Sequence, residues 1–342
     1  MAAICNGNVA TGARAPGPFK VIALPDPPRS VKFGLDLPSI SGSVRYGRVI
    51  IEGVPVTQPE SPVATPETLA DLRVDIDRID LALHQLLMER GTIIDRLIAV
   101  KARQGGGSAF RPAREAAMMR ALAERHKGSL PLDTVESIWR IIIATFTYVQ
   151  SPFCVYGDIS QGDAKMRDIA RFHFGFSVPY RPLPQASDVI SAVASSKGDL
   201  GILQLESAHG AGVWWAGLCP VDAPKIIARL PFIERGDHPA GMPAFVIAQP
   251  LAEAAARDLV VYALSFERWR PGLERVIIGL GGEIIANAAD AMGLQVLAEL
   301  PGNCAVRDLT SALQAEKVPA MRIIEVGSHA ARFGIEQAPQ RG

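Results

Sequence analysis

The chain has 342 residues, equal numbers of basic and acidic side chains (35 each) and a hydrophobic fraction of 48%. That length is sufficient for two or three domains with substantial cores. Zero net charge and the lack of a basic run argue against nucleic acid and anionic membranes as partners. No run of about 18 apolar residues could span a bilayer, and no secretory leader pattern opens the sequence, so we expect a cytoplasmic protein.

The cysteines and histidines give no sign of a cofactor. The four cysteines are dispersed, without disulfide or metal-ligand spacing (Cys5, Cys154, Cys219 and Cys304). The six histidines are scattered, and none forms a ligand pair at helical spacing. We therefore expect neither a metal ion nor another cofactor.

The two ends of the chain have the composition of disordered segments. Residues 1–65 are rich in proline, glycine and serine, as in ARAPGPFK and LPDPPRS. Segments of this kind bury too little apolar surface to fold. We interpret residues 1–65 as a mostly disordered extension or a misplaced translation start, and residues 335–342 as a disordered tail.

The segment 66–104 has the pattern of one long amphipathic helix. Thr65 is a candidate N-cap, Pro66 suits the first helical position, and Gly105 begins the glycine run that ends the helix. Apolar side chains recur along it at helical spacing: Leu72, Ile76, Ile79, Leu83, Leu86, Ile94 and Leu97. At about 1.5 Å per residue the rod is roughly 58 Å long, too long for two short helices of the same chain to cover. We therefore infer a homodimer.

Three basic residues on this helix are candidates for binding an anion. Arg90 and Lys101 are close to three full turns apart, so they lie on one face and their side chains can converge. Arg73 is rotated away and lies about 25 Å from Arg90, so it would serve the pocket of a partner that runs antiparallel. The alternative is a solvated face, which is the usual role of Arg and Lys on long helices.

Two shorter helical patterns follow, from 111 to 125 and from 131 to 150. In the second, Asp133 and Glu136 are spaced like a capping box. The three helices together resemble the all-helical chorismate mutase family, through LADLRVDIDRID (69–80), LLMERGTIIDRLIAVK (86–101), PAREAAMMRAL (112–122) and IWRIIIATFTYVQ (138–150). The resemblance implies an all-α three-helix domain at 66–150 that forms an intertwined dimer.

The reaction of that family is the rearrangement of chorismate to prephenate, a pericyclic shift without proton transfer or a covalent intermediate. The resemblance implies that Arg90 and the partner subunit's Arg73 bind the two substrate carboxylates, which suit a planar guanidinium. It also implies that Lys101 and Gln150 donate hydrogen bonds to the ether oxygen as that bond breaks. The expected function is a chorismate mutase of aromatic amino-acid biosynthesis.

The resemblance assigns two further residues and also has two departures. Arg114 would add positive field, and Glu115 would accept a hydrogen bond from the ring hydroxyl. Arg111 stands where family members often carry Asp, and Phe146 stands where many carry Ser. Both changes are expected to weaken substrate binding without abolishing catalysis. Glu115 also fits a simpler role as an acid at a helix N-terminus, and Gln150 fits a solvated helix end.

Residues 151–258 alternate short β-branched runs with helical stretches, which indicates an α/β domain. The strings VYGDISQGDAKMRDIARFHFG and LGILQLES resemble the first lobe of prephenate dehydratase, which is periplasmic-binding-protein-like. Active dehydratases carry Thr-Arg-Phe at the start of a strand, where this chain has Pro243-Ala244-Phe245. We expect no dehydratase activity, because the hydroxyl and the guanidinium are both missing. A generic α/β domain is the alternative.

Residues 259–334 read as strand (LVVYALSF), helix (RPGLERVI), two strands, helix (VRDLTSALQAE) and strand (MRIIEVG). This pattern resembles an ACT regulatory module, a small α+β fold. The effector motif Glu-Ser-Arg-Pro is missing, so we expect a structural role rather than feedback by phenylalanine. Two other hypotheses remain for the chain: a bifunctional chorismate mutase/prephenate dehydratase, and a non-catalytic regulatory dimer.

Overall fold

The computed structural model describes residues 68–103, 109–205, 213–250 and 256–334. Its first elements are three helices, α1 (Leu69–Arg103), α2 (Pro112–Arg125) and α3 (Leu132–Gln150). The three expected helices are therefore confirmed, and at about 1.5 Å per residue α1 is roughly 52 Å long. The terminal segments expected to be disordered, 1–65 and 335–342, lie outside the described residues.

The start of α1 differs from the sequence prediction. The expected cap, Thr65, lies outside the described residues, and the helix begins at Leu69 behind Thr68. The hydroxyl of Thr68 accepts a hydrogen bond from the backbone N–H of Asp71 at 3.2 Å, and the Asp71 carboxylate accepts from the N–H of Thr68 at 3.0 Å. This reciprocal pair satisfies two of the N–H groups that a helix start leaves open.

The prediction of a capping box at Asp133 and Glu136 is wrong. Pro131 is the N-cap of α3, and no side chain caps that end. Glu136 is instead only 1% exposed, and its carboxylate lies 3.2 Å from Nε2 of His238. Glu136 therefore pairs with a buried residue of a distant segment and does not cap its own helix.

The rest of the chain alternates strands and helices, as expected. The elements up to residue 250 are β1 (Val155–Asp158), α4 (Asp163–Phe174), β2 (Tyr180–Leu183), α5 (Ala186–Ala194), β3 (Leu200–Gln204), the short 3₁₀ helix η1 (Trp214–Leu218), β4 (Lys225–Leu230), β5 (Ile233–Glu234) and β6 (Ala244–Ala248). The last part has β7 (Leu259–Phe266), α6 (Pro271–Gly279), β8 (Glu283–Asp290), β9 (Gly293–Pro301), α7 (Val306–Ala315), β10 (Arg322–His329) and β11 (Phe333–Gly334).

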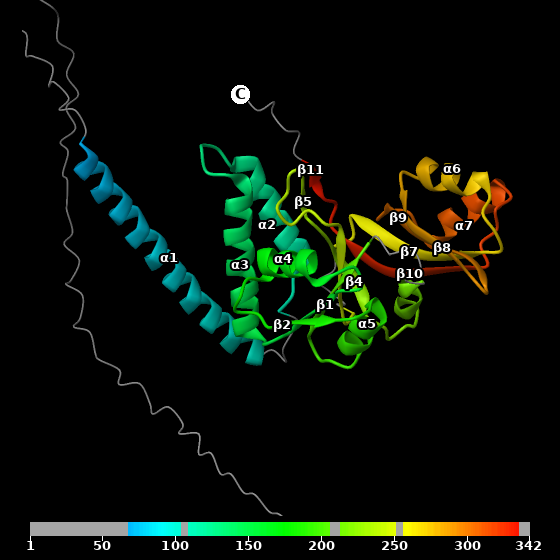
Figure 1. Cartoon of the computed structure of the whole chain (residues 1–342), viewed down its shortest axis with the longest axis horizontal. Helices are drawn as coiled ribbons and strands as arrows, with labels where there is room; N and C mark the ends of the chain where they lie inside the picture. Colours follow the sequence, from blue (N-terminus) through cyan, green and yellow to red (C-terminus); the bar gives the residue numbers. More distant parts are fainter. Residues whose placement is uncertain (1–67, 104–108, 206–212, 251–255, 335–342) are drawn as a thin grey trace, which may run out of the picture. The chain divides into compact units, whose positions relative to one another are not determined.

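Nine of these strands form one mixed sheet in the order β2-β1-β3-β6-β4-β10-β7-β9-β8 (Figure 1). The segment from β7 to β10 has the order βαββαβ, with its strands antiparallel. It joins the preceding α/β region where β10 runs beside β4, with Gly327 opposite Ile226. Gly327 has φ +149°, and a Cβ there would lie 2.3 Å from the carbonyl oxygen of Ile226, so this junction requires glycine.

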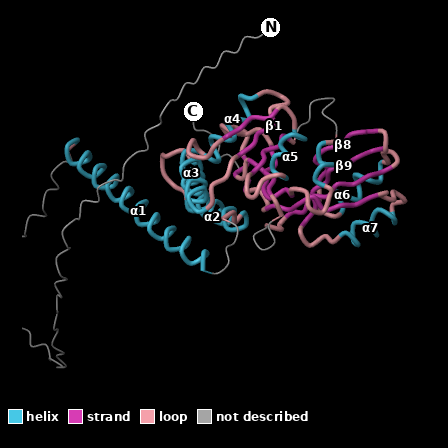
Figure 2. Tube along the Cα trace, turned by 90° about the horizontal axis from the view of Figure 1, so that it is seen from below, coloured by secondary structure: helices cyan, strands magenta, loops and turns pink. Residues whose placement is uncertain are grey.

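Consecutive residues of the central strands belong to different cores, because side chains alternate between the two faces of a sheet. Ile202 and Val246 pack with α4 and with Ala144 of α3. Their neighbours Leu203 and Phe245 pack with α5 and η1 on the other face. A third core forms where α6 and α7 pack on β7 and β9 (Figure 2). Helices therefore cover both faces, and α3 belongs to one of these layers.

The helices α2 and α3 are also fastened to the strands by a fourth apolar cluster. Met119 and Leu122 of α2 and Ile143 of α3 pack there against Phe232 and Ile233. Each of these side chains is less than one-tenth exposed. The helical segment and the α/β region therefore share buried surface, and this packing holds α2 and α3 against the strands.

Candidate functional site

The ends of α1 and α3 bring together two residues that are 49 positions apart in sequence. The ammonium of Lys101, in the last turn of α1, donates a hydrogen bond to Oε1 of Gln150 at 3.2 Å. The amide nitrogen of Gln150 donates to the carbonyl oxygen of Phe146 at 3.0 Å, which fixes the orientation of the amide. Two of the residues expected to act together are therefore neighbours in the fold.

Arg90 lies against the same two helices. Its guanidinium carbon is 4.5 Å from the centroid of the Phe146 ring, one turn before Gln150 on α3. Nη1 of Arg90 is buried and has no hydrogen-bond partner among the described residues. Burial and the nearby positive charge of Arg114 lower the pKa of Arg90. A buried donor without a partner, beside a second cation, is a site that an anion would stabilise.

The short helix α2 adds further positive charge. Burial and the charge of Arg111 lower the pKa of Lys101. Arg111 immediately precedes α2, and Arg114 lies in its first turn. Four basic side chains from α1 and the start of α2 therefore act on one region: Arg90, Lys101, Arg111 and Arg114. This arrangement can hold a small molecule with two negative charges.

Glu115 has different surroundings from the other candidates. Its carboxylate lies 4.0 Å from the guanidinium of Arg140 on α3. Burial raises the pKa of Glu115, against the opposing effects of Arg140 and the backbone hydrogen bond. Ala116 and Ile143 line the same hollow as Glu115, on the side of α2 and α3 that faces the strands. In this structure the carboxylate of Glu115 therefore lies beside Arg140.

Arg73 is exposed near the start of α1 and is not brought to the other candidates within the one chain. Arg90 lies 17 positions further along the helix, which is a distance of about 25 Å. The apolar stripe around it is also uncovered. Ile94 is the only buried residue of α1, while the rest of the stripe is at least 39% exposed: Leu72, Ile76, Ile79, Leu83, Leu86 and Leu97.

The segment that carries this geometry matches a known family. Residues 72–151 match the family model described as chorismate mutase type II. This segment is a chorismate mutase type II domain. The match begins at Leu72 and ends at Ser151, so it includes Arg73, Arg90, Lys101, Arg114 and Gln150.

Two curated relatives are described as bifunctional chorismate mutase/prephenate dehydratases. The bifunctional chorismate mutase/prephenate dehydratase of Neisseria gonorrhoeae is 27% identical over 141 residues, which are 41% of this chain and 38% of that protein. The protein of the same description from Pseudomonas aeruginosa is 27% identical over 149 residues, covering 42% of this chain and 40% of that protein. The chain thus spans about two fifths of the length of these relatives.

Solved structures of prephenate dehydratases are similar at a lower level. The enzyme from Streptococcus mutans has 12% sequence identity and a TM-score of 0.35, covering 54% of this chain and all of that one. The enzyme from Arthrobacter aurescens, solved in complex with L-Phe, has 10% identity and a TM-score of 0.36, covering 54% and 93%.

Two contacts of the chorismate mutase domain do not follow from the sequence patterns. The sequence comparison singles out Phe146 for the hydroxyl it lacks, whereas in the structure its ring packs against the guanidinium of Arg90. The spacing of Phe146 and Gln150, one helical turn, could have indicated that both reach α1. The contact between Arg140 and Glu115 is the second, and no spacing in the sequence indicates it.

The part of the chain described here has no group of three or more His, Cys, Asp or Glu arranged to hold a metal ion. Within the same ranges, no helix is long and apolar enough to cross a membrane.

Proposed function

We propose that the chorismate mutase domain of this chain isomerises chorismate to prephenate, as a cytoplasmic step of phenylalanine and tyrosine biosynthesis. The observation that carries this proposal is the Lys101–Gln150 pair beside Arg90, whose buried Nη1 has no hydrogen-bond partner among the described residues. Chorismate carries two carboxylates and one ether oxygen. The cluster offers cations for the former and hydrogen-bond donors for the latter.

The chemistry follows from what the reaction requires. A pericyclic shift needs no acid, base or cofactor, so the protein acts by holding the enolpyruvyl side chain over the ring and by stabilising developing charge. Arg90 binds one carboxylate bidentately. Lys101 donates to the ether oxygen, and Gln150 does so through its amide nitrogen. Arg114 contributes positive field, and Glu115 turns from Arg140 to accept from the ring hydroxyl.

The site is completed by a second copy of the chain. The uncovered apolar stripe of α1 supports a homodimer, since exposed apolar faces of this size are typical of interfaces. In an antiparallel arrangement of two α1 helices, the partner subunit's Arg73 reaches the site that contains Arg90. That residue then binds the second carboxylate.

The α/β region is proposed to lack dehydratase activity, and the βαββαβ segment to be an ACT-like module with a structural role. Pro243 and Ala244, at the start of β6, stand where active dehydratases carry the hydroxyl and the guanidinium, and neither side chain has a polar group. The bifunctional alternative rests on the curated relatives, which are described as chorismate mutase/prephenate dehydratases. The alternative of a non-catalytic regulatory dimer rests on Phe146 and Arg111.

The decisive experiment follows chorismate through the loss of its diene absorbance, with purified full-length protein and identification of the product. Accumulation of prephenate, lost in Lys101→Ala, supports the proposal. Formation of phenylpyruvate from added prephenate would favour the bifunctional alternative. Unchanged chorismate, with a folded dimer, would favour the regulatory one.

A further inference from the structure

A series of polar side chains connects the start of α2 to the segment between β5 and β6. Its first member is Glu115, whose carboxylate lies 4.0 Å from Nη1 of Arg140 on α3. One turn earlier on α3, Oε1 of Glu136 lies 3.9 Å from Nε of Arg140. The other oxygen of Glu136 lies 3.2 Å from Nε2 of His238. The α/β region is therefore connected, through three side chains, to a residue assigned to the chorismate site.

His238 binds Glu136 as a hydrogen-bond donor. The backbone N–H of Ala240 donates to Nδ1 of His238 at 3.0 Å, so Nδ1 carries no proton. The ring proton is therefore on Nε2, which donates to Glu136. Both side chains are at most 1% exposed. Glu136 is thus fixed from the α/β region, and its second oxygen faces Arg140.

Arg140 lies between two carboxylates. Its Nε faces Glu136 and its Nη1 faces Glu115, and its side chain is only 10% exposed. The ring of Phe232 lies 5.8 Å from the guanidinium carbon and limits its movement. The structure therefore holds one positive charge beside Glu115 and anchors that charge on a buried acid.

His173, at the end of α4, faces the same hollow as Glu115 and Arg140 but adds no charge there. Burial and the charges of Arg140 and His238 hold the pKa of His173 well below its usual value. Its ring is therefore neutral at physiological pH.

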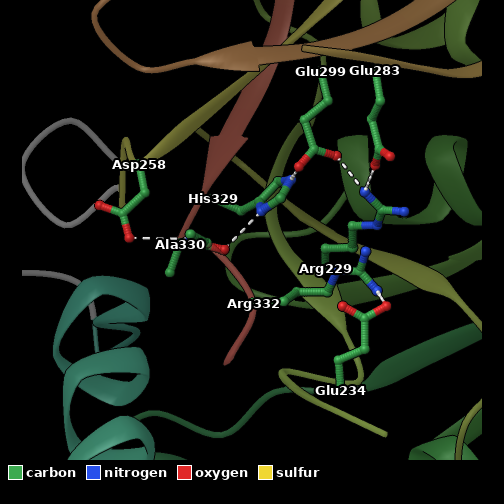
Figure 3. A network of polar contacts seen from close by, with 9 residues as sticks. Arg229, Glu234, Asp258, Glu283, Glu299, His329, Ala330 and Arg332 are labelled. Carbon is green, nitrogen blue, oxygen red and sulfur yellow. Dashed lines mark hydrogen bonds and ion pairs between the residues drawn. The ribbon is translucent and has the colours of Figure 1, made fainter. Parts of the chain in front are cut away.

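Arg229, on β4, lines the same hollow and pairs with carboxylates of other strands. Its Nη1 lies 2.6 Å from Glu299 and also contacts Glu283 (Figure 3). Glu299 in turn lies 3.3 Å from His329. Two strands of the βαββαβ segment therefore balance the charge of Arg229.

Arg140 is thus the cation of this wall that acts on Glu115. The basic residues at the start of α2, Arg111 and Arg114, are exposed, whereas Arg140 is buried and screened less by salt. Burial raises the pKa of Glu115, and Arg140 opposes that effect. An opposite charge favours the ionised form of a carboxyl group over about 4–6 Å. The Glu115 carboxylate can therefore turn toward a substrate and still be stabilised by Arg140.

We propose that Arg140 is a positioning residue of the mutase reaction, which keeps Glu115 ionised and able to accept a hydrogen bond from the ring hydroxyl of chorismate. This inference rests on the proposed function. A protonated Glu115 would present a hydrogen-bond donor to a hydroxyl that must itself donate. Glu136 and His238 contribute from a distance, because they hold Arg140 in place.

The pH profile of kcat/KM for chorismate, measured on the full chain, tests the proposal, because its acid limb reports groups of the free enzyme. Arg140→Met should move that limb to higher pH by about one unit, the lower end of the effect of an opposite charge at this distance. KM should rise within the limb while kcat changes little, because Glu115 binds the hydroxyl before and during the reaction. Arg140→Lys keeps the charge and should restore the original limb.

Glu115→Gln shows whether Arg140 acts through Glu115. The amide does not ionise, so this variant should lose the acid limb and raise KM by about tenfold. Adding Arg140→Met to it should then change neither property. An equal fall in kcat/KM with and without the Glu115 carboxylate would show a merely structural effect and would overturn the proposal. Arg120→Met is the matched control, since Arg120 lies 5.7 Å from the same Phe232 ring but faces Asp258, and it should keep the profile.

Arg140→Met leaves Glu136 buried without its cation, which is destabilising. If that variant does not fold, the double variant Glu136→Gln, Arg140→Met removes both charges, retains an acceptor for His238 and should shift the acid limb in the same direction.

Infrared difference spectra follow the ionisation of Glu115 without turnover, because its carboxyl band is the one missing from Glu115→Gln. An active chain whose Glu115 ionises at the same pH with and without Arg140 would overturn this inference alone. An unmodified chain that leaves chorismate unchanged would overturn the proposed function, and the role of Arg140 with it.

Discussion

The guanidinium of Arg90 stacks over the ring of Phe146, with 4.5 Å between the guanidinium carbon and the ring centroid. A small hydroxyl residue would leave Arg90 dependent on substrate for its orientation. Here the aromatic face orients the cation before any anion arrives, and Gln150 is fixed to the carbonyl oxygen of Phe146 one turn away. Phe146 therefore organises two of the proposed site residues, although it contributes no hydroxyl of its own.

Phe146→Leu should raise KM for chorismate about three- to fivefold with kcat little changed, because a partly desolvated cation–π contact contributes about 0.5–2 kcal/mol to the placement of Arg90. Steady-state kinetics measures this. Phe176→Leu is the matched control, since Arg171 lies 4.7 Å from the Phe176 ring elsewhere in the fold. A fall in kcat with an unchanged KM would mean that Phe146 acts on the transition state instead.

Lys101→Ala and Gln150→Ala should each lower kcat by about a hundred- to a thousandfold, as loss of one preorganised donor to developing charge typically does. KM should change less, because the ether oxygen gains charge only as the bond breaks. Lys165→Ala, an exposed lysine on α4, controls for loss of positive charge. Near-full turnover in a folded Lys101→Ala, Gln150→Ala double variant would exclude the assigned roles.

The positive charge of Arg111 should affect the pH dependence of turnover. Lys101 must be protonated to donate, and burial together with Arg111 lowers its pKa. Activity should therefore fall on the alkaline side at a lower pH than the ordinary lysine value of about 10.4 predicts. Arg111→Ala removes a like charge, raises the pKa of Lys101 and moves that limb to higher pH. Arg111→Lys keeps the positive charge and should leave the pH profile unchanged. An identical shift in both variants would show that the charge of Arg111 is not what lowers the pKa of Lys101.

The sequence predicted the elements that depend on local pattern. The long helix, the two shorter helices and the strand-helix order from 259 to 329 are all present. These predictions rest on apolar periodicity, which reports which side of an element is buried. The helical spacing also correctly put Lys101 and Arg90 on one side of α1, facing α3.

Contacts between distant segments could not be predicted in the same way. Glu136 has the spacing of a helix cap, yet it pairs with His238, 102 positions away. Glu115 faces Arg140 rather than the Lys101–Gln150 pair, because α2 and α3 also pack against the strands. The orientation of a polar side chain on such a helix depends on which of two neighbours it meets. That choice is made by tertiary packing, which spacing does not encode.

The shared site predicts subunit complementation. Arg73→Ala and Arg90→Ala should each be inactive as homodimers, because each lacks one carboxylate ligand in every site. After mixing and exchange, half of the dimers are mixed, and each mixed dimer has one intact site, so about a quarter of the unmodified activity should return. Mixing with Arg73→Ala, Arg90→Ala double-variant protein is the control. If the mixture stays inactive although exchange is demonstrated, Arg73 does not act across the dimer.

Acid stability should depend on His173. Its folded-state pKa lies well below that of the unfolded chain, so below about pH 6.5 the unfolded state binds a proton that the folded state does not. Stability therefore falls with decreasing pH through that window, by up to about 1.4 kcal/mol per pH unit from this residue.

His173→Leu should remove this pH dependence. Urea unfolding of both proteins at several pH values between about 5 and 7, a range that spans the ordinary histidine pKa, measures the difference in the free energy of unfolding. Ile143→Val, a buried substitution on α3 that involves no titratable group, should lower stability by about 0.5–1.5 kcal/mol equally at each pH. A His173→Leu curve parallel to that of the unmodified chain would show that His173 is protonated in the folded state as readily as in the unfolded one.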